Sequence, residues 1–283
     1  MTSIIKQLAL QSGHVIQHLS KQDWVNFGKN DDFDYMIVSD SHGCLNNKMM
    51  LIDLFNETDW SEILSTDTWC EEIIKKSNIN TFRVGATLTV LKIYPDTIEC
   101  YWIGDSSAKI YTFDKENNAS LLWSTKDHDY NNKNDYESML EDTELFPKMV
   151  IKKTYDIQAI TPTMILSVPS KSFTIGKEGV NMTRVLGHQG CFAKYGFDKT
   201  VIDREKNTTY KIVAATDGFW QVMSDEDIPF ISDKDNNSEC LAKNAMGRWG
   251  QAWDHDNSFN VIEKNIYFPN HNWDDVGVTT WSN

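Results

Sequence analysis

Three aspartates stand beside apolar runs of the sequence, where their carboxylates could bind metal. Asp40 closes the run DYMIVSD, Asp217 follows YKIVAAT, and Asp274 stands just before VGVTTW. A carboxylate at a strand end lies at the rim of a sheet, where water and ions can reach it. Three such groups at one place would repel one another unless cations bridged them, and oxygen ligands suit Mg²⁺ or Mn²⁺. The pattern indicates a divalent-metal site, although any one of these residues alone could simply cap a turn.

The elements that would position these residues are mostly strands. Runs of β-branched and aromatic residues predict strands at 34–40, 81–94, 97–103, 107–113, 149–155, 164–168, 210–216 and 276–281. Helices are predicted at 42–58, 61–77 and 238–255, with a further N-terminus at Ser224 and a short helix after the polar stretch 127–135. Leu241, Ala245, Trp249 and Trp253 form one stripe of the third helix. Short strands with a few helices indicate an α+β fold of stacked antiparallel sheets covered by helices.

Composition limits the classes of function. The chain has 283 residues, 40% of them hydrophobic and 12% aromatic, and no repeat, linker or long charge block, so one folded domain over 1–283 is expected. A net charge of −14 repels nucleic acid and anionic membranes, so neither is an expected partner. It also repels phosphorylated substrates. With only 27 Lys and Arg, bound cations are the obvious local source of positive charge.

Cysteine usage and hydropathy indicate the compartment. The five cysteines, Cys44, Cys70, Cys100, Cys191 and Cys240, are scattered and form no CxxC pair. This argues against a disulfide framework and a zinc finger, and fits a reducing compartment. No stretch approaches the roughly 18 apolar residues of a membrane span. We therefore expect a soluble, cytoplasmic protein.

Eight short strings follow one another in an order that is typical of one enzyme family. They are Gln22-Asp23, VSDSHG at 38–43, GATLTVLKI at 85–93, YWIGDS at 101–106, Asp127-His128, MTRVLG at 182–187, AATDGFWQVMSDED at 214–227 and WDDVGV at 273–278. In this order the chain resembles protein phosphatase 2C-like, PPM-type, metal-dependent serine/threonine phosphatases over nearly its whole length. Each string alone is weak evidence, but eight in order are strong.

The resemblance implies a fold and a metal site. The fold would be a four-layer αββα sandwich of two antiparallel sheets flanked by helices. The site would hold two Mn²⁺ or Mg²⁺ ions and a weaker third ion. In these roles Asp40 bridges the two ions, Asp217 and Asp274 complete one shell, the Ser41 carbonyl and Asp23 serve the other, and Asp105 binds the third.

The resemblance also implies the reaction. Two divalent ions would lower the pKa of a shared water and orient a phosphoserine or phosphothreonine for in-line attack. His42, two residues after Asp40, would protonate the leaving alkoxide. The simpler interpretation of His42 is a surface residue at a helix N-terminus. No cysteine nucleophile is needed.

Six positions depart from the family pattern. His18 stands where the family places an arginine that grips phosphate, so substrate phosphate should bind more weakly. Ser41 replaces the first Gly of DGHG. The others are His188 for the Asp of SRALGD, Gln221 for the second Asp of DGxxD, Asp275 for the closing Asn, and Ser107 for the Arg of GDSR.

Two classes of function remain open. The first is an active phosphatase acting on phosphoproteins, based on Asp40, Asp217, Asp274 and His42. The second is a pseudophosphatase, the same fold used as a binding or regulatory module, based on the departures at His18, Ser41, His188 and Gln221. A metal-dependent nuclease is disfavoured because the chain has no evident basic track for nucleic acid. The resemblance implies a monomer, and nothing in the sequence, such as a heptad pattern, argues otherwise.

Overall fold

Two antiparallel sheets form the centre of the molecule. The computed structural model describes residues 10–43, 45–78, 83–141, 149–175, 178–190, 192–228, 237–257 and 261–283. The seven-stranded sheet has the order β12-β4-β3-β5-β6-β13, with β2 also paired to β3. Its strands are β2 (Asp23–Lys29), β3 (Asp34–Gly43), β4 (Val84–Ala86), β5 (Leu88–Ile93), β6 (Thr97–Ile103), β12 (Leu186–Gly187) and β13 (Asp198–Asp203).

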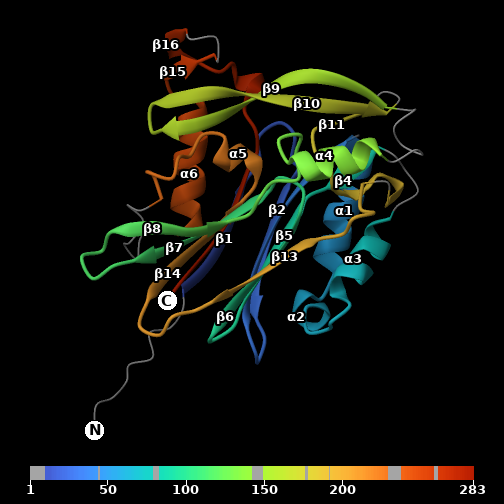
Figure 1. Cartoon of the computed structure of the whole chain (residues 1–283), viewed down its shortest axis with the longest axis vertical. Helices are drawn as coiled ribbons and strands as arrows, with labels where there is room; N and C mark the ends of the chain where they lie inside the picture. The colour runs from blue at the N-terminus through green and yellow to red at the C-terminus, as the bar shows by residue number, and fades with distance from the viewer. Residues whose placement is uncertain are drawn as a thin grey trace.

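The five-stranded sheet packs against it and has the order β1-β17-β14-β7-β8. Its strands are β1 (Leu10–Ile16), β7 (Ser107–Phe113), β8 (Ala119–Ser124), β14 (Thr209–Ala215) and β17 (Val276–Ser282). Each pair of neighbours in it is antiparallel. Figure 1 shows the two sheets side by side, with helices on their outer sides.

Helices cover both outer faces of this pair. α1 (Leu45–Glu57), α2 (Trp60–Ile63) and α3 (Trp69–Ser77) lie on the seven-stranded sheet, and α5 (Asp217–Trp220) and α6 (Ser238–Trp249) lie on the five-stranded sheet. Three buried clusters separate the layers. One lies under α1–α3, one lies under α5 and α6, and the third fills the space between the sheets. The expected α+β fold and its αββα layering are confirmed.

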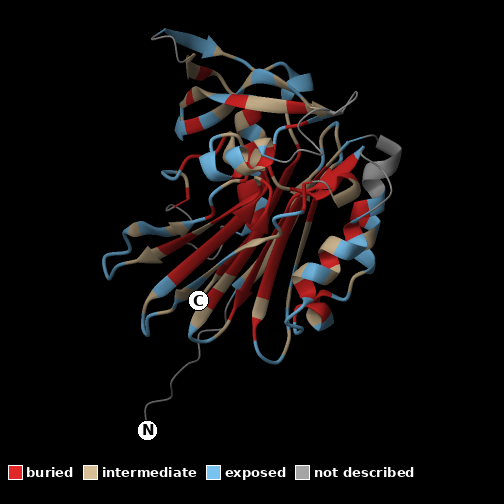
Figure 2. Ribbon diagram, turned by 45° about the vertical axis from the view of Figure 1, so that its right-hand side comes forward, coloured by how far each residue is buried: buried red, intermediate tan, exposed pale blue. Residues whose placement is uncertain are grey.

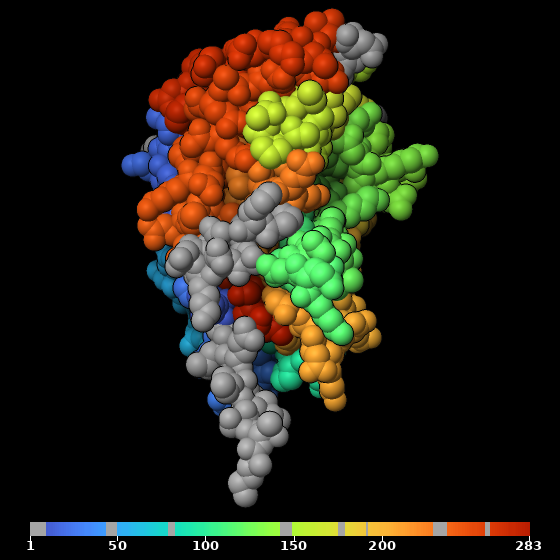
Figure 3. Space-filling model, turned by 90° about the vertical axis from the view of Figure 1, so that its left-hand side faces the viewer, coloured from blue at the N-terminus to red at the C-terminus, as the bar shows by residue number. Residues whose placement is uncertain are grey.

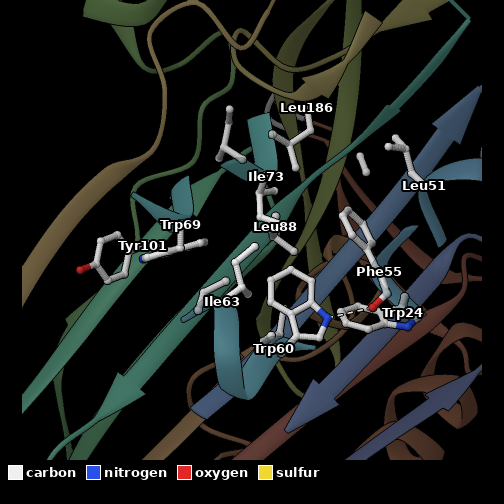
Figure 4. Close-up of a cluster of buried hydrophobic side chains, with 14 of the residues drawn as sticks. Trp24, Leu51, Phe55, Trp60, Ile63, Trp69, Ile73, Leu88, Tyr101 and Leu186 are labelled. Atoms are coloured by element: carbon white, nitrogen blue, oxygen red, sulfur yellow. Dashed lines mark hydrogen bonds between the residues drawn. The ribbon is translucent and has the colours of Figure 1, made fainter. Parts of the chain in front are cut away.

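Strand alternation explains how the layers are filled. In β3, Tyr35 and Ile37 pack against α1–α3, whereas Met36 and Val38 pack between the sheets. The helix side is rich in tryptophan. The Trp60 ring packs against Trp24 and Phe55 in a tilted arrangement, and its Nε1 donates to the Phe55 carbonyl over 2.8 Å (Figure 4). Buried strands therefore have apolar side chains on both faces, which is what a central layer requires.

A third sheet was not predicted. It has the order β11-β10-β15-β16, with β9 paired to β10. Its strands are β9 (Met149–Thr161), β10 (Met164–Ile175), β11 (Glu178–Val180), β15 (Trp253–Asp256) and β16 (Ile262–Ile266). The β10–β15 pair is parallel, so antiparallel pairing alone does not describe the whole fold. Figure 2 shows the contrast between its largely exposed or intermediate residues and the buried strands below.

Several predicted boundaries were wrong for local reasons. The helix predicted at 238–255 ends at Trp249, because Gly250 is its C-cap, and Trp253 begins β15 instead. The helix predicted at 42–58 begins at Leu45, since residues through Gly43 belong to β3. Residues 61–77 divide into α2 and α3, and 81–94 divide at Thr87 into β4 and β5.

The remaining helical predictions differ in outcome. Ser224 does not begin a described helix: turns follow it, although its hydroxyl and, as in a capping box, its N–H both donate to Asp227 Oδ2. Residues 229–236 lie outside the described part of the chain. The short helix after the polar stretch is α4 (Lys133–Leu140). Within the described residues, no helix combines the length and apolarity that crossing a membrane needs.

The C-terminal part of the chain forms much of one face. Figure 3 views the molecule from this side, where orange and red atoms, which include α6, cover the upper part beside the yellow-green β9–β10 hairpin. Beneath α6, the buried residues Leu241, Ala245 and Trp249 form the predicted stripe. A stripe at this spacing places one helix face against the sheet.

We expect Lys211 to reduce stability at neutral pH. It is 5% exposed in β14, and burial lowers its pKa to about 8, below the ordinary value of about 10.4. Because the folded pKa is below the unfolded one, stability rises as pH increases from about 8 to about 10.4. Lys211→Met should raise the free energy of unfolding at pH 7 by about 1–3 kcal/mol, and this gain should shrink over that window. Urea denaturation measures it. Lys206→Met, at an exposed site, should show no such window. If the stability of Lys206→Met depended on pH in the same way as that of Lys211→Met, burial of Lys211 would not be the cause.

Candidate active site

Strands of both sheets end at one place and bring the predicted carboxylates together. Asp23, the first residue of β2, pairs directly with Asp40 near the end of β3. Thr216 follows β14 and donates its N–H to the Gly277 carbonyl of β17 over 3.0 Å. Its hydroxyl donates to Asp23 Oδ2 over 2.7 Å. This threonine therefore joins the two sheets at the acidic end.

Glycine allows Asp217 and Asp274 to approach each other. Asp217 opens α5, and Gly218 lies so close to the next segment that a Cβ there would be 2.9 Å from Asp274 Cβ and 2.1 Å from the Asp275 carbonyl oxygen. Trp249 Nε1 of α6 donates to the Gly218 carbonyl over 3.0 Å and fixes this turn from behind. Any larger residue at position 218 would separate the two aspartates.

The charges of these residues act on one another. Burial, the largest cause, raises the pKa of Asp217 well above its ordinary value, and repulsion from its acidic neighbours raises it further; those neighbours are Asp274, Asp105, Asp40 and Asp23. Burial likewise raises the pKa of Asp23, with Asp40, Asp274 and Asp275 adding to it. A group of buried carboxylates in this relation must either take up protons or bind cations.

Two of the carboxylates, those of Asp217 and Asp274, accept local hydrogen bonds. Asp217 accepts from the Gly218 N–H over 2.9 Å and from Gln221 Nε2 over 3.1 Å. Asp274 accepts from the Asp275 N–H over 2.8 Å. Among the residues that the structure describes, no three His, Cys, Asp or Glu side chains are grouped closely enough to hold one metal ion. The oxygen-only, buried donor set fits a hard divalent cation by its chemistry.

Ser41 occupies its position without backbone strain. It lies within β3, its N–H donates to the Gln22 carbonyl over 3.0 Å, and its φ is not in the left-handed region. The glycine two positions on is the demanding one, because Gly43 has φ 116° and a Cβ there would lie 1.8 Å from the Arg83 carbonyl oxygen. Replacing the first glycine of the motif by serine therefore leaves the main-chain carbonyl in place.

Asp105 lies in an acidic cleft. It follows β6, and burial followed by repulsion from Asp127 and Asp40 raises its pKa well above the ordinary value. The cleft has a volume of about 190 Å³, and Asp129, Asp156 and Asp217 also line it. A neighbouring cleft of about 690 Å³ shares Asp127 and Asp129 with it, so the two lie side by side. Gln221, which replaces an acidic residue of the family pattern, lines the smaller cleft and donates to Asp217.

His42 and His188 form a pair of facing imidazoles. Their Nε2 atoms are 2.7 Å apart and their rings stack with centroids separated by 4.9 Å. A Cβ at Gly85 would lie 2.3 Å from His188 Nε2 and 2.4 Å from His42 Nε2, so glycine makes room for both rings. Burial, and then the neighbouring His188, lower the pKa of His42 to about 3. Its Nδ1 is buried without a hydrogen-bond partner among the described residues.

His18 is held beside the carboxylates by its surroundings. Its Nε2 lies 2.9 Å from the Asn270 carbonyl, to which it must donate, and its ring lies against Trp273 at 5.6 Å between centroids. Burial, the largest cause, raises the pKa of Asp274, and His18 lowers it by a smaller amount. With Nε2 donating to a carbonyl, only a protonated ring has a second N–H, on Nδ1, to offer a phosphate.

Asp275 organises the segment that carries His18. Its Oδ1 accepts a short hydrogen bond from the His18 N–H, and its Oδ2 accepts from Ser20 Oγ over 2.8 Å and the Gln22 N–H over 2.6 Å. The side chain is 1% exposed. This aspartate, which replaces the family's asparagine, therefore uses its extra charge to accept three donors that precede Asp23.

The remaining motif residues form a structural network. His128 is fully buried, its Nδ1 accepts the Gly104 N–H over 3.1 Å, and its Nε2 lies 3.2 Å from Asp198 Oδ2. Arg184 contacts both Asp135 and Asp198. His128 first, and also Arg184, lower the pKa of Asp198 to about 2. The network ties α4 and β13 to the loop after β6.

Sequence reasoning missed several groups in the site. Thr216 and Thr87 anchor Asp23 and Asp40 through hydroxyl groups, at 2.7 Å from Oδ2 and 2.8 Å from the Asp40 N–H. Thr216 stands directly before Asp217, and this adjacency was the available signal. Asp156 comes from β9 of the unpredicted sheet, and nothing in its local sequence indicated that it lines the cleft.

Replacing Asp275 with Asn should destabilise the protein. The amide has one acceptor oxygen, so its NH₂ group would face a backbone N–H of His18 or Gln22 and leave that donor without a partner. We expect the free energy of unfolding to fall by about 1–3 kcal/mol, measured by urea denaturation. Asp203→Asn, at an exposed residue, is the matched control and should change little. Equal stability of Asp275→Asn and the native chain would show that the three hydrogen bonds do not matter.

Comparisons with known proteins identify the fold. No protein-family model matches the chain, and no curated protein sequence matches it either. Among solved structures, a serine/threonine phosphatase of S. agalactiae is 17% identical with a TM-score of 0.56, covering 97% of this chain and 99% of its own. Serine-threonine phosphatase 2C of Toxoplasma gondii is 14% identical with a TM-score of 0.58, covering 96% and 94%. The catalytic domain of the phosphatase PstP, in complex with two manganese ions, is 12% identical with a TM-score of 0.53, covering 96% and 97%. The chain has the fold of the 2C-type serine/threonine phosphatases.

Proposed function

We propose that this chain is a metal-dependent protein serine/threonine phosphatase that hydrolyses phosphoserine and phosphothreonine in proteins. The observation that carries the proposal is the meeting of Asp23, Asp40, Asp217 and Asp274 at the ends of strands from both sheets. Their mutual repulsion favours cations, and the fold is that of 2C-type phosphatases. We propose that it works as a cytoplasmic monomer with one domain over 1–283.

The metal ligands proposed are the residues named from the sequence. Asp40 would be shared by two Mn²⁺ or Mg²⁺ ions. Asp217 and Asp274 would serve one of them, Asp23 and the Ser41 carbonyl would serve the other, and Asp105 would hold a weaker third. When bound, such ions supply an acidified water and neutralise phosphate charge. PstP, which shares this fold, was solved with two manganese ions.

The chain's own residues would bind and orient the substrate. The cleft beside Asp105 is acidic, so a phosphate approaching it needs the cations and whatever positive charge His18 can add. His18 lies within electrostatic reach of Asp274. Its neutral ring has no N–H to spare, so we propose that only protonated His18 contributes to phosphate binding.

His42 would protonate the leaving alkoxide, and His188 limits how well it can do so. The pKa of about 3 leaves His42 neutral at pH 7, and its Nε2 faces His188. A neutral imidazole with one nitrogen engaged is a weak acid catalyst. These features favour a slow enzyme for substrates whose leaving group needs a proton.

A pseudophosphatase is the second candidate function. Two observations support it: His42 is neutral and faces His188, and no three of the described carboxylate, histidine or cysteine side chains are grouped closely enough to hold a metal ion. In that case the acidic cleft would bind a phosphoprotein or another partner without hydrolysis, and the fold would act as a regulatory module.

Hydrolysis of a phosphothreonine peptide with added Mn²⁺ tests the proposal. Asp217→Asn should lower kcat by at least about 100-fold and weaken Mn²⁺ binding in calorimetry, because it removes a ligand charge. Asp203→Asn, an exposed aspartate of β13, should leave both unchanged. If the native chain neither hydrolyses the peptide nor binds Mn²⁺, the enzyme proposal is wrong. Binding without hydrolysis supports the pseudophosphatase.

Replacing His188 with Asp should improve the acid step. A carboxylate facing His42 stabilises the imidazolium and raises its pKa. We expect kcat for a phosphoserine peptide to rise about threefold or more at neutral pH, with little change for p-nitrophenyl phosphate, whose leaving group needs little protonation. His188→Asn has the same shape without the charge and should give no such gain. Equal changes with both substrates would remove His42 from this role.

A further inference from the structure

A buried lysine lies among aromatic rings on the helix side of the seven-stranded sheet. Lys92 of β5 pairs with Tyr35 of β3 and Glu99 of β6. Its Nζ lies 5.3 Å from the centroid of Phe33, 5.8 Å from Trp69 and 5.6 Å from Tyr101. Trp69 and Tyr101 meet edge to face at 5.0 Å, as Figure 4 shows at one end of the buried cluster. The rings partly replace water around the ammonium.

The hydrogen bonds of this ammonium are incomplete. Lys92 is 5% exposed, and its Nζ donates to the Leu64 carbonyl over 2.5 Å. Leu64 is the C-cap of α2, so this bond completes a helix end. An ammonium has three N–H groups, and the other two have no acceptor among the described residues. A buried N–H group without an acceptor destabilises the fold, and the bond to the Leu64 carbonyl accounts for only one of the three N–H groups.

The ammonium lines a large cleft. Its volume is about 1410 Å³, above the roughly 300–1,000 Å³ of typical ligand pockets. Tyr94 and Phe197 add further aromatic surface to the walls, and Ile74 of α3 adds aliphatic surface. We name this space the Lys92 cleft. Apolar side chains share its lining with charged and polar ones, so a ligand that combines an apolar body with one polar group would match it.

The Lys92 cleft is separate from the acidic site. Tyr35, which pairs with Lys92, stands five residues before Asp40 in β3, a separation of about 17 Å along the strand. Lys92 contacts rings that pack under α1–α3, whereas Asp40 lies on the same strand face as Met36 and Val38, which pack against the other sheet. The two sites therefore open on different faces of the same sheet.

The charges around the cleft define what could fill it. Lys199 is paired with Glu99 over 3.2 Å, and the Tyr101 hydroxyl also donates to Glu99 over 2.8 Å. The lining also includes Asp31, Asp32, Asp67 and Glu71, which repel ligands with several negative charges. One negative group, placed at the ammonium, satisfies its free N–H groups. A flat apolar body would pack against Tyr94 and Phe197, the half-buried rings of the lining.

We infer that the Lys92 cleft binds a small organic acid, with its single carboxylate on the Lys92 ammonium and an aromatic or aliphatic body against Tyr94 and Phe197, the half-buried rings of the lining. The site is independent of the phosphatase proposal. Nothing in the inference requires metal at the acidic cleft.

Calorimetry of the full chain in metal-free buffer tests the inference, with 2-naphthoate as the probe. The native protein should bind 2-naphthoate with a Kd below about 1 mM. Naphthalene-2-methanol, which has the same rings without the charge, should bind at least tenfold more weakly. Lys92→Met should weaken 2-naphthoate at least tenfold, whereas Lys199→Met, at a lysine of the same cleft that is already paired with Glu99, should change it less than twofold.

A second variant covers the case in which Lys92→Met does not fold. Ile74→Trp keeps Lys92 and narrows the cleft beside α3, and it should weaken 2-naphthoate binding at least tenfold. The inference is overturned if the native chain does not bind the probe, if the alcohol binds equally well, or if Ile74→Trp binds it unchanged. Equal affinity of Lys92→Met and Lys199→Met would overturn the role of the ammonium.

Discussion

Repulsion among buried carboxylates is the constraint on which this structure depends. Asp23, Asp40, Asp217 and Asp274 come from two sheets, and on top of the effect of burial Asp40 and Asp274 raise the pKa values of both Asp23 and Asp217. Each unit of such a shift corresponds to about 1.4 kcal/mol, so the fold holds this end of the molecule against a real penalty. The β2–β3 ladder, the Thr216 hydroxyl and the absence of a side chain at Gly218 keep the groups together. A bridging cation would attract all of these carboxylates, so the same arrangement would then stabilise the fold.

The departures from the family pattern are connected through hydrogen bonds. Asp275 adds a negative charge beside the site, but its carboxylate accepts hydrogen bonds from the His18 N–H, the Ser20 hydroxyl and the Gln22 N–H. The segment that positions Asp23 is therefore held by a carboxylate where the family has an amide. His18 is fixed in the same way, between Asn270 and Trp273. His18 stands where the family has a phosphate-binding arginine, and here it is part of the hydrogen-bonded segment that precedes Asp23.

The sequence predicted what local patterns determine. Strand runs that end in aspartate gave the acidic site, and alternation in residues such as Tyr35 to Val38 gave the layered core. The β1 strand was missed because Gln11, Ser12 and Gly13 interrupt its apolar pattern, and only the ladder with β17 makes it a strand. The strands predicted at 149–155 and 164–168 form the β9–β10 hairpin, but its pairing with β15 and the role of Asp275 depend on partners far away in the chain, which no local pattern reports.

The contact between His42 and His188 depends on the residues around His188. Gly187 has φ 79°, and His188 and Gln189 follow in left-handed conformations at φ 47° and 57°. This turn aims the His188 ring at His42 across Gly85, where any side chain would collide with both rings. An aspartate at position 188 is shorter than a ring, so the contact between the two Nε2 atoms is specific to histidine. The pair keeps His42 neutral by burial and by a like partner, whereas a carboxylate would favour the charged form. The residue facing His42, more than the metal ligands themselves, is therefore where this chain differs in acid–base chemistry from the pattern that it resembles.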